Sequence, residues 1–407
     1  MSSNILNLLD TQMNQVKDNN IQEVELIEFK DNFYYVPGFG NVGVVITDEG
    51  VVVIDTGINK EHAKKIYNRI REETDQPIRY IIYTHGHMDH VNSTDVFMEE
   101  KTEVIGHENI AERFRKYEDL IQHRKRIGTI QFENKTSAAK SYDFVYPTIT
   151  FSKNYEFSLG GKSFDIVHGK GETDDHCFIH IKEDDVIYCG DFFIWAFPNI
   201  GNPLKEIRFE REWYETVEGI LKKKPSYVVP GHGALLEGEN VIQTSLQDVV
   251  DCLRFVHEKV VYYLNQGVSL EEMLERIELP ERLQSSEYIT QKYGCLSFAI
   301  KGTYRRYTGW FDGNPTNLNP SKGSEVAKEV LYLIEDSNKI LERCMELATK
   351  GDFQLALHLL DLLILGEKDQ KALEMKGILV EKLSDTDENF ISRNIYRQLA
   401  MKLKEIQ

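Results

Sequence analysis

The sequence predicts an α+β protein, in which a strand-rich amino-terminal part is followed by an all-helical part. Short runs rich in valine, isoleucine and aromatic residues recur up to residue 230, with glycine between many of them, as in strands joined by tight turns. From Val241 onward, apolar residues recur at helical spacing instead. This change of period places a domain boundary near residue 240, between domains 1–240 and 241–407.

The first part of the chain predicts a sheet followed by a helix. Strands are predicted at 24–29, 33–36, 42–46 and 51–54. Helical spacing follows over 61–73 and again over 108–127. Residues 1–22 are polar and are predicted to form a loose helix, and residues 128–148 are expected to form a loop or a lid.

A dense polar cluster follows the apolar run Tyr80–Tyr83, which is predicted to be a buried strand. Within six residues stand His85, His87, Asp89 and His90. Neutral imidazole and carboxylate are common ligands of zinc and its first-row neighbours. If the end of the strand stays extended, His85 and His87 can bind one ion, while Asp89 and His90 can reach a second. A polar loop that merely contains histidines is disfavoured by this density, so the cluster predicts a metal site.

Three later strand-like runs each end near a further candidate ligand. The runs are 164–168, 186–190 and 227–230, and the candidates that follow them are Glu172, Asp191 and His232. Strand ends that meet at one edge would bring these side chains to a common site. Asp55 also ends a strand-like run. It is either an acceptor that supports the metal loop or a helix cap, and the residues alone leave both interpretations open.

The carboxy-terminal part predicts successive helices. Helical spacing covers 241–266, 269–277, 324–350, 354–365 and 370–382. Ser269 and Glu272 have the spacing of a capping box. Gly351 and Gly366 are predicted to separate the later helices, which are expected to pack as tetratricopeptide-like pairs.

Composition narrows the class of partner and the compartment. The 407 residues carry 48 Lys and Arg against 66 Asp and Glu, a net charge of −18. A surface this acidic argues against binding a nucleic-acid backbone. The five cysteines are widely spaced without a Cys-x-x-Cys pair, which is typical of free thiols in a reducing compartment. With neither a signal peptide nor a long apolar run predicted, we expect a cytoplasmic protein that does not insert into membranes.

The stretch from Thr84 to His90, Thr-His-Gly-His-Met-Asp-His, resembles the metal-binding signature of the metallo-β-lactamase superfamily, His-x-His-x-Asp-His. The resemblance implies an αββα sandwich with a dinuclear metal site at one edge of the two sheets. It implies that one metal is held by His85, His87 and Glu172. The other is then held by Asp89, His90 and His232, with Asp191 between the two metals. Asp89 and Asp191 are the implied catalytic carboxylates.

A second resemblance is to the alkyl sulfatase branch of that superfamily. Members of this branch have a glutamate where most members of the superfamily have a third histidine, and Glu172 stands at that position here. The stretch 307–318, Tyr-Thr-Gly-Trp-Phe-Asp-Gly-Asn-Pro-Thr-Asn-Leu, is similar to a signature of its dimerisation domain. The resemblance implies a sulfuric ester hydrolase that acts on a small alkyl sulfate or a related amphiphile. It also implies a homodimer, and we predict its contact within 241–317.

Three departures from the branch qualify this resemblance. Asp191 stands where the branch has a second glutamate. The stretch 192–199 lacks the histidine that the branch uses to hold sulfate and to protonate the leaving alcohol. Many relatives also end in a sterol-carrier-like domain, and this sequence ends before one.

The chemistry of such a site leaves alternatives open. Two cations that share a water can activate it and polarise an ester. Three carboxylates give the site hard oxygen ligands. Zinc can bind such a site, and so can manganese or iron. The alternative functions are another hydrolase of the superfamily (thioesterase, lactonase or phosphoesterase), an iron-dependent oxidoreductase, or a non-enzymatic dimerising protein.

Overall fold

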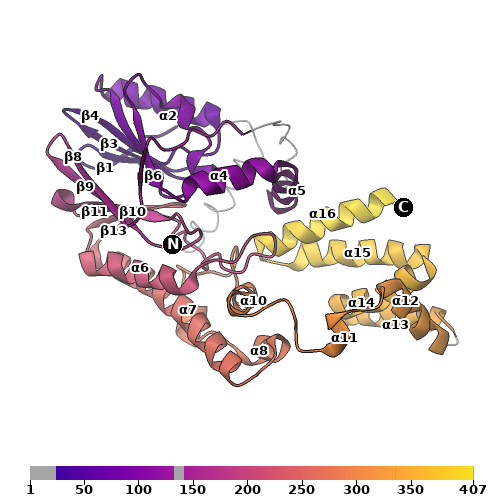
Figure 1. The fold of residues 1–407 in the computed structure, drawn as a ribbon. Helices are drawn as coiled ribbons and strands as arrows, with labels where there is room; N and C mark the ends of the chain where they lie inside the picture. Colours follow the sequence, from indigo (N-terminus) through magenta and orange to yellow (C-terminus); the bar gives the residue numbers. More distant parts are fainter. Residues whose placement is uncertain (1–23, 133–141, 335, 407) are drawn as a thin grey trace. The chain divides into compact units, whose positions relative to one another are not determined.

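The computed structural model describes residues 24–132, 142–334 and 336–406 (Figure 1). The chain divides into two compact units, the first ending at Tyr307 and the second formed by 308–407 with the short segment 128–133. The loose helix predicted over 1–22 lies outside the described residues, as does the middle of the loop predicted over 128–148.

The first sheet has seven strands among the described residues, in the order β1 to β7. They are β1 Ile27–Lys30, β2 Phe33–Val36, β3 Val42–Thr47, β4 Gly50–Ile54, β5 Ile78–Ile82, β6 Glu103–His107 and β7 Ile149–Phe151. Strands β1 to β4 pair antiparallel, whereas β4 to β7 pair parallel. The parallel pairing places the carboxyl ends of β4, β5 and β6 at the same edge, which is where the predicted metal cluster begins.

The second sheet has six strands among the described residues, in the order β13-β12-β11-β10-β9-β8. They are β8 Asn154–Leu159, β9 Lys162–His168, β10 Cys177–Ile181, β11 Val186–Gly190, β12 Tyr227–Pro230 and β13 Leu236–Glu237. Only β11 and β12 pair parallel, the remaining neighbours being antiparallel. The carboxyl ends of β11 and β12 therefore also share one edge.

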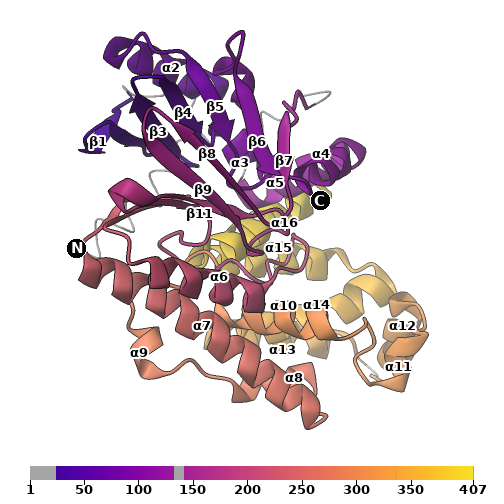
Figure 2. The same cartoon turned by 60° about the vertical axis from the view of Figure 1, so that its left-hand side comes forward.

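The described helices up to Tyr307 are α2 Lys60–Glu73, α3 Met88–Val91, α4 Ile110–Asp119, α5 Ile121–Phe132, α6 Glu210–Lys223, α7 Glu239–Asn265, α8 Leu270–Arg276, α9 Glu281–Gln284 and α10 Leu296–Tyr307, with short 3₁₀ turns at Thr94–Val96 and Lys182–Asp184. Of these, α2 and α4 cover the outer face of the first sheet, and α6 and α7 cover that of the second. Figure 2 shows the sheets between α2 on one side and α6 on the other. The helix predicted over 108–127 is two helices, and the second continues to Phe132.

Alternation of apolar side chains along the strands explains the layers. One buried cluster lies between the sheets and joins Val45 and Ile82 to Ile179 and Val186. A second joins the other face of the first sheet to α2 and α4, and a third joins the other face of the second sheet to α6 and α7. Successive side chains of a strand point to opposite faces, so each strand feeds two layers. The predicted αββα sandwich is confirmed.

The compact units divide near Tyr307 and not near residue 240, where the sequence changes period. Helix α7 carries a buried apolar face, including Leu246, Leu253 and Val260, that packs into the same cluster as Trp213 of α6. The helical part that starts at 239 thus begins inside the first unit. The division into domains 1–240 and 241–407 by function stays a prediction.

The second unit is helical throughout its described residues. Its helices are α11 Pro315–Leu318, α12 Gly323–Leu333, α13 Asn338–Lys350, α14 Phe353–Glu367, α15 Gln370–Thr386 and α16 Phe390–Ile406. Helices α12 to α16 share one apolar core, with Leu360 of α14 fully buried. The helix predicted over 324–350 is two helices, α12 and α13.

The two glycines predicted to separate helices play different roles. Gly351 ends α13 in the left-handed conformation at φ +83°, as predicted. Gly366 lies inside α14, and a Cβ there would lie 2.5 Å from the Leu331 side chain of α12. Gly366 therefore permits two helices to approach closely.

Candidate metal centre

The histidine cluster begins where β5 leaves the first sheet. The strand ends at Ile82, and the short helix α3 begins at Met88. Between them, His85 is fully buried, and His90 is buried in α3. The chain stays extended at His87, with φ −73° and ψ 146°, as the sequence prediction for this loop requires.

The second sheet brings the remaining candidates to the same place. Asp191 directly follows β11, and His232 follows β12 by two residues. The parallel pairing of these strands continues past their ends, because the Gly231 amide donates to the Gly190 carbonyl at 2.7 Å. A Cβ at Gly231 would lie 2.0 Å from Asp191 Oδ1, so only glycine lets the His232 loop approach Asp191.

The predicted ligands gather into two groups. The first is His85, His87, Glu172 and Asp191, and the second is Asp89, His90 and His232. In each group, candidate ligand atoms lie within 4.8 Å of one another. The structure thus brings all seven predicted residues together in the grouping that the superfamily resemblance implies. Their role as ligands stays a prediction.

Distances within the first group fit a shared ion. His85 Nε2 lies 2.9 Å from His87 Nδ1, and His87 Nδ1 lies 3.1 Å from Glu172 Oε2. Asp191 Oδ2 lies 3.6 Å from His85 Nε2. Two imidazole nitrogens and two carboxylate oxygens therefore point at one small volume.

Asp191 also reaches the second group. Its Oδ1 lies 3.3 Å from both His90 Nε2 and His232 Nε2. Asp89 Oδ2 lies 3.5 Å from His232 Nε2 and 3.8 Å from His90 Nε2. Because one oxygen of Asp191 faces each group, this carboxylate has the geometry of a bridge.

Unpartnered polar atoms support a fit to metal ions. His90 Nε2 and Asp191 Oδ1 are buried without a hydrogen-bond partner. Buried polar atoms are normally hydrogen-bonded, and an imidazole nitrogen and a carboxylate oxygen that face each other are the donor atoms that zinc, manganese or iron bind. The donor set therefore fits divalent metal ions.

Electrostatics differ between the two groups. Burial, together with the nearby imidazoles for His85 and Arg208 for His87, holds the pKa of both histidines well below its ordinary value. Burial would also lower the pKa of His90, but the Asp191 and Asp55 carboxylates hold it well above that value. His85 and His87 are therefore neutral at pH 7, as a metal ligand must be.

Asp55 supports the ligand loop and does not cap a helix. Its Oδ2 accepts a hydrogen bond from His90 Nδ1 at 2.8 Å and from Thr84 Oγ1 at 2.7 Å, while Oδ1 accepts from the Thr84 amide at 2.7 Å. Helix α2 is capped instead by Asn59. The structure thus decides between the two interpretations of Asp55 in favour of the acceptor, whose bond orients the His90 ring.

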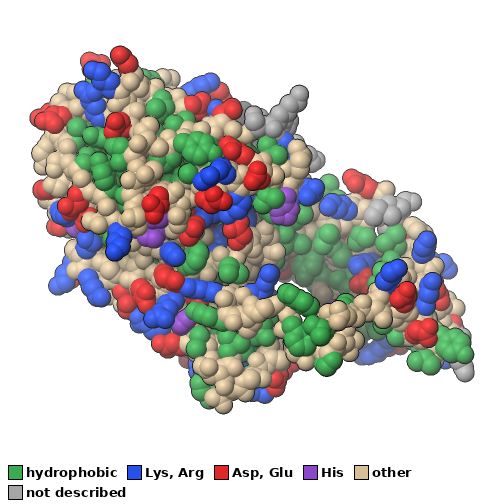
Figure 3. Space-filling model, in the orientation of Figure 1, with side chains coloured by type: hydrophobic (Ala, Val, Ile, Leu, Met, Phe, Trp, Pro, Cys, Tyr) green, Lys and Arg blue, Asp and Glu red, His purple; other side chains and the backbone are tan. Residues whose placement is uncertain are grey.

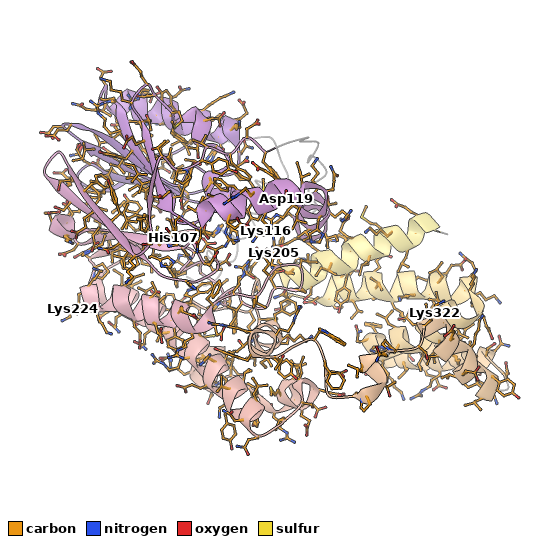
Figure 4. All side chains as sticks on the ribbon, viewed as in Figure 1. His107, Lys116, Asp119, Lys205, Lys224 and Lys322 are labelled. Atoms are coloured by element: carbon orange, nitrogen blue, oxygen red, sulfur yellow. The ribbon has the colours of Figure 1, made fainter. Side chains whose placement is uncertain are left out.

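Sequence reasoning missed three residues beside the site. Arg208 is buried and forms an ion pair with Glu172. Lys205, labelled in Figure 4 with Lys116 of α4, is partly buried. Burial and the charges of Arg124 and Arg208 lower the pKa of Lys205 to about 7. Burial and the charges of Glu172 and Asp89 raise the pKa of Tyr293. A usable signal was the pair of cations in Lys205-Glu-Ile-Arg208, in a loop soon after Asp191.

Comparison with protein families agrees with this fold. Residues 35–232 match the model of the metallo-beta-lactamase superfamily, so this part of the chain is a domain of that superfamily. Residues 269–405 match the model named alkyl sulfatase dimerisation. Both resemblances inferred from the sequence are thus confirmed.

Three curated relatives that cover most of the chain are named alkyl sulfatases. A linear primary-alkylsulfatase of Pseudomonas sp. is 24% identical over 383 residues, which cover 88% of this chain and 72% of the relative. An (R)-specific secondary-alkylsulfatase of Pseudomonas sp. is 25% identical, with 96% of this chain and 64% of the relative covered. An alkyl/aryl-sulfatase of Saccharomyces cerevisiae is 24% identical, with 93% and 64% covered. The chain thus spans about two thirds of the length of these relatives.

A solved structure shares the fold. A stereoselective inverting sec-alkylsulfatase from Pseudomonas sp. superposes with a TM-score of 0.84 at 24% sequence identity, covering 96% of this chain and 67% of that chain. Among the described residues, no helix combines the length and the apolar character needed to cross a membrane.

Proposed function

We propose that this protein is a dinuclear metal-dependent hydrolase that cleaves the sulfate ester of an alkyl or related amphiphilic substrate. The observation that carries the proposal is the convergence of seven candidate ligands on two adjoining positions with Asp191 between them. The relatives named alkylsulfatases support the substrate class.

The proposed ions are two divalent metals, Zn²⁺ first, with Mn²⁺ or Fe²⁺ as alternatives because of the carboxylates. His85, His87 and Glu172 would hold one ion, and Asp89, His90 and His232 the other, with Asp191 shared. When bound, the two ions supply an activated water and withdraw charge from the ester. Asp89 and Asp191 keep the two positions close and are the catalytic carboxylates of this proposal.

Cationic residues beside Glu172 suit an anionic substrate group. The Arg208 guanidinium is buried against Glu172, and the charges of Arg208, Asp89 and Glu172 all act on Lys205. A desolvated guanidinium binds planar or tetrahedral oxyanions with paired N–H donors. Arg208 and Lys205 would therefore orient the sulfate, and the Tyr293 phenol would contribute to the same wall.

A second candidate is a hydrolase of the same superfamily that acts on a thioester, a lactone or a phosphate ester. Two observations favour it. Asp191 replaces the glutamate usual in the branch, and the stretch 192–199 is buried throughout and contains no histidine. This stretch therefore contains no imidazole that could contact the sulfate or donate a proton to the leaving alcohol.

Substrate assays on the metal-loaded protein separate these candidates. We expect inorganic sulfate to be released from dodecyl sulfate, and no comparable rate on a thioester, a lactone or a phosphate monoester. In the His87→Ala control, metal and activity should be lost while the circular dichroism spectrum is kept, because the sheets do not depend on that side chain. Turnover of the other esters without sulfate release would favour the second candidate, and full activity in His87→Ala would refute the site.

The second unit supports the proposal of a homodimer. The predicted contact within 241–317 includes α7 and the aromatic loop 309–317. Most apolar residues of α7 are buried within the first unit. Large apolar side chains are exposed instead in the second unit, where Trp310 is 76%, Tyr332 85% and Leu333 79% exposed. Figure 3 shows apolar side chains on the visible surface of this unit. We therefore propose a contact centred on 308–333.

The cysteines support the proposed location. Each of the five cysteines, Cys177, Cys189, Cys252, Cys295 and Cys344, is unbridged. A cytoplasmic location therefore stays our prediction.

A further inference from the structure

A buried carboxylate connects the two loops that carry the first group of candidate ligands. Asp175 is fully buried, three residues after Glu172. Its Oδ2 accepts a hydrogen bond from the Gly86 amide at 2.7 Å. Gly86 stands between His85 and His87, so this one bond fixes the histidine loop relative to the Glu172 loop.

Helix α4 supplies the counter-charge of that carboxylate. Arg113 is buried, and its Nε donates to Asp175 Oδ1 at 2.9 Å. Its Nη2 pairs with Asp174 Oδ1, and Asn109 Nδ2 also donates to Asp174 Oδ2 at 3.1 Å. One guanidinium thus holds two consecutive carboxylates of the Glu172 loop against α4.

The packing around Gly86 leaves no free space. A Cβ at this position would lie 2.8 Å from Asp175 Oδ2 and 2.9 Å from Arg113 Cδ. Burial alone would raise the pKa of Asp175, but the Arg113 charge and the Gly86 amide hold it below its ordinary value. The carboxylate therefore stays charged and remains an acceptor for Gly86 despite its burial.

A second buried carboxylate contacts both groups of candidate ligands. Asp55 accepts hydrogen bonds from His90 Nδ1 and from Thr84, and the Thr84 hydroxyl lies 3.1 Å from His85 Nδ1. Asp55 is thus connected to a ligand of each group. Asp175, which is held by the ion pair from α4, bonds only to the loop of the first group.

We propose that Arg113 and Asp175 are positioning residues that set the metal affinity of the His85, His87 and Glu172 position without setting that of the other position. This inference rests on the proposed metal centre. Partners that orient metal ligands typically change metal affinity by about 10- to 100-fold when they are removed. The two positions should therefore be separable by substitutions that leave every candidate ligand in place.

The test measures zinc affinity and stoichiometry of the full chain by competition with a chromophoric chelator. In wild type, we expect two tightly bound zinc ions. Asp175→Asn should weaken only one of them, by about 10- to 100-fold, whereas Asp55→Asn should weaken both, because Asp55 is connected to His90 and, through Thr84, to His85. To assign the positions, Asp175→Asn is combined with His232→Ala, which leaves only the first position. The single remaining zinc should then be the weakened one.

Two further variants separate positioning from general stability. Arg113→Lys keeps the charge but not the two-pronged contact, so its affinity should lie between those of wild type and Asp175→Asn. Arg115→Ala removes an exposed ion pair with Glu112 on the same helix and should leave both affinities unchanged. Wild-type zinc affinity in Asp175→Asn, or an equal loss at both positions in Arg113→Lys, would overturn the inference while leaving the metal centre intact. Absence of zinc binding in wild type would overturn the centre itself, and the inference with it.

Discussion

Glu172 is the residue at which the charge of the centre can be changed while a ligand atom remains. It lies 3.1 Å from His87 Nδ1 and pairs with Arg208. Glu172→His should keep metal but add about one unit of positive charge, so that the acidic midpoint of the pH–rate profile moves to lower pH. It also leaves the buried Arg208 unpaired, which costs stability. The measurements are metal content, the pH–rate profile and the denaturant midpoint.

A matched double variant separates the two effects of that substitution. Glu172→His combined with Arg208→Gln removes the unpaired cation, so stability should recover while the midpoint of the pH–rate profile stays shifted, at a lower rate because Arg208 is proposed to orient the sulfate. A profile with the wild-type midpoint and height in Glu172→His would show that Glu172 is not a metal ligand.

His168 provides a pH-dependent contribution to stability outside the candidate ligands. Its ring stacks on His107, labelled in Figure 4, at 3.9 Å between centroids, and its Nε2 bonds to the Asp174 carbonyl at 2.9 Å. Burial and the His107 ring lower the pKa of His168, against the opposing effect of the Asp174 carbonyl. Below about pH 6.5, the ordinary value, the unfolded chain binds this proton more readily than the folded one. Stability is therefore complete above that pH and falls as the pH decreases through the folded-state pKa.

His168→Gln should reduce this acid sensitivity, because the glutamine amide can still donate to Asp174 but does not titrate. Urea unfolding of the metal-free protein at pH 7.5 and pH 5.5 gives the loss of unfolding free energy in each variant. We expect a smaller loss in His168→Gln than in wild type, and the wild-type loss in His123→Gln, where the side chain is exposed. An identical loss in all three proteins would contradict the assignment.

At the scale of elements, the loop after β12 depends on a close contact with the chain after β11. Gly233 has φ +85°, and a Cβ there would lie 2.4 Å from Trp195 Cδ1. Trp195 itself has φ +54° and donates from Nε1 to the Ala234 carbonyl at 2.7 Å. A bulky residue in this conformation is kept only where its surroundings enforce it. The indole thus fixes the loop that carries His232.

Gly233→Ala should therefore lower stability by about 1–2 kcal/mol for the left-handed backbone and displace His232, which weakens metal binding at the second position. Gly267→Ala is the matched control. Gly267 also has positive φ, at +70°, but a Cβ there meets open space. We expect a smaller loss of stability in the control, which lacks the contact with Trp195, and no loss of metal affinity, measured by thermal unfolding and zinc competition. Equal zinc affinities in both variants would show that the Trp195 contact does not position His232.

At the scale of the whole molecule, the exposed apolar residues of the second unit predict a two-fold dimer. Light scattering at micromolar concentration should give about twice the single-chain mass of 47.2 kDa. Substitution of Tyr332 and Leu333 by aspartate should reduce the mass to one chain, because charges would then be buried in the contact. Ile207, an exposed apolar residue of the first unit, gives the control Ile207→Asp, which should remain dimeric. A wild-type mass near 47.2 kDa would refute the dimer.

The sequence by itself determined many of the strands and helices and the start of the candidate site. The run Tyr80–Tyr83 and the ligands after it are close in the chain, so local spacing predicts the strand end and its cluster. The capping box of Ser269 and Glu272 was likewise predictable and is present, because its hydrogen bonds span only three residues. The αββα fold and the assignment of Glu172, Asp191 and His232 came from the family resemblance, since local spacing says nothing about which distant strand ends meet.

Only the tertiary structure decided which distant residues support the site. Asp175 bonds to Gly86 across 89 positions of sequence, and Asp55 to His90 across 35. The pair Lys205 and Arg208 gave only a weak signal, because two cations in a polar loop have no period and no fixed spacing from Glu172. The apolar face of α7 was read correctly as a helix face, yet the sequence could not say that α6 covers it. Each of these contacts depends on how strands from two sheets meet at one edge, and that arrangement is set by packing across the sandwich and not by any local pattern.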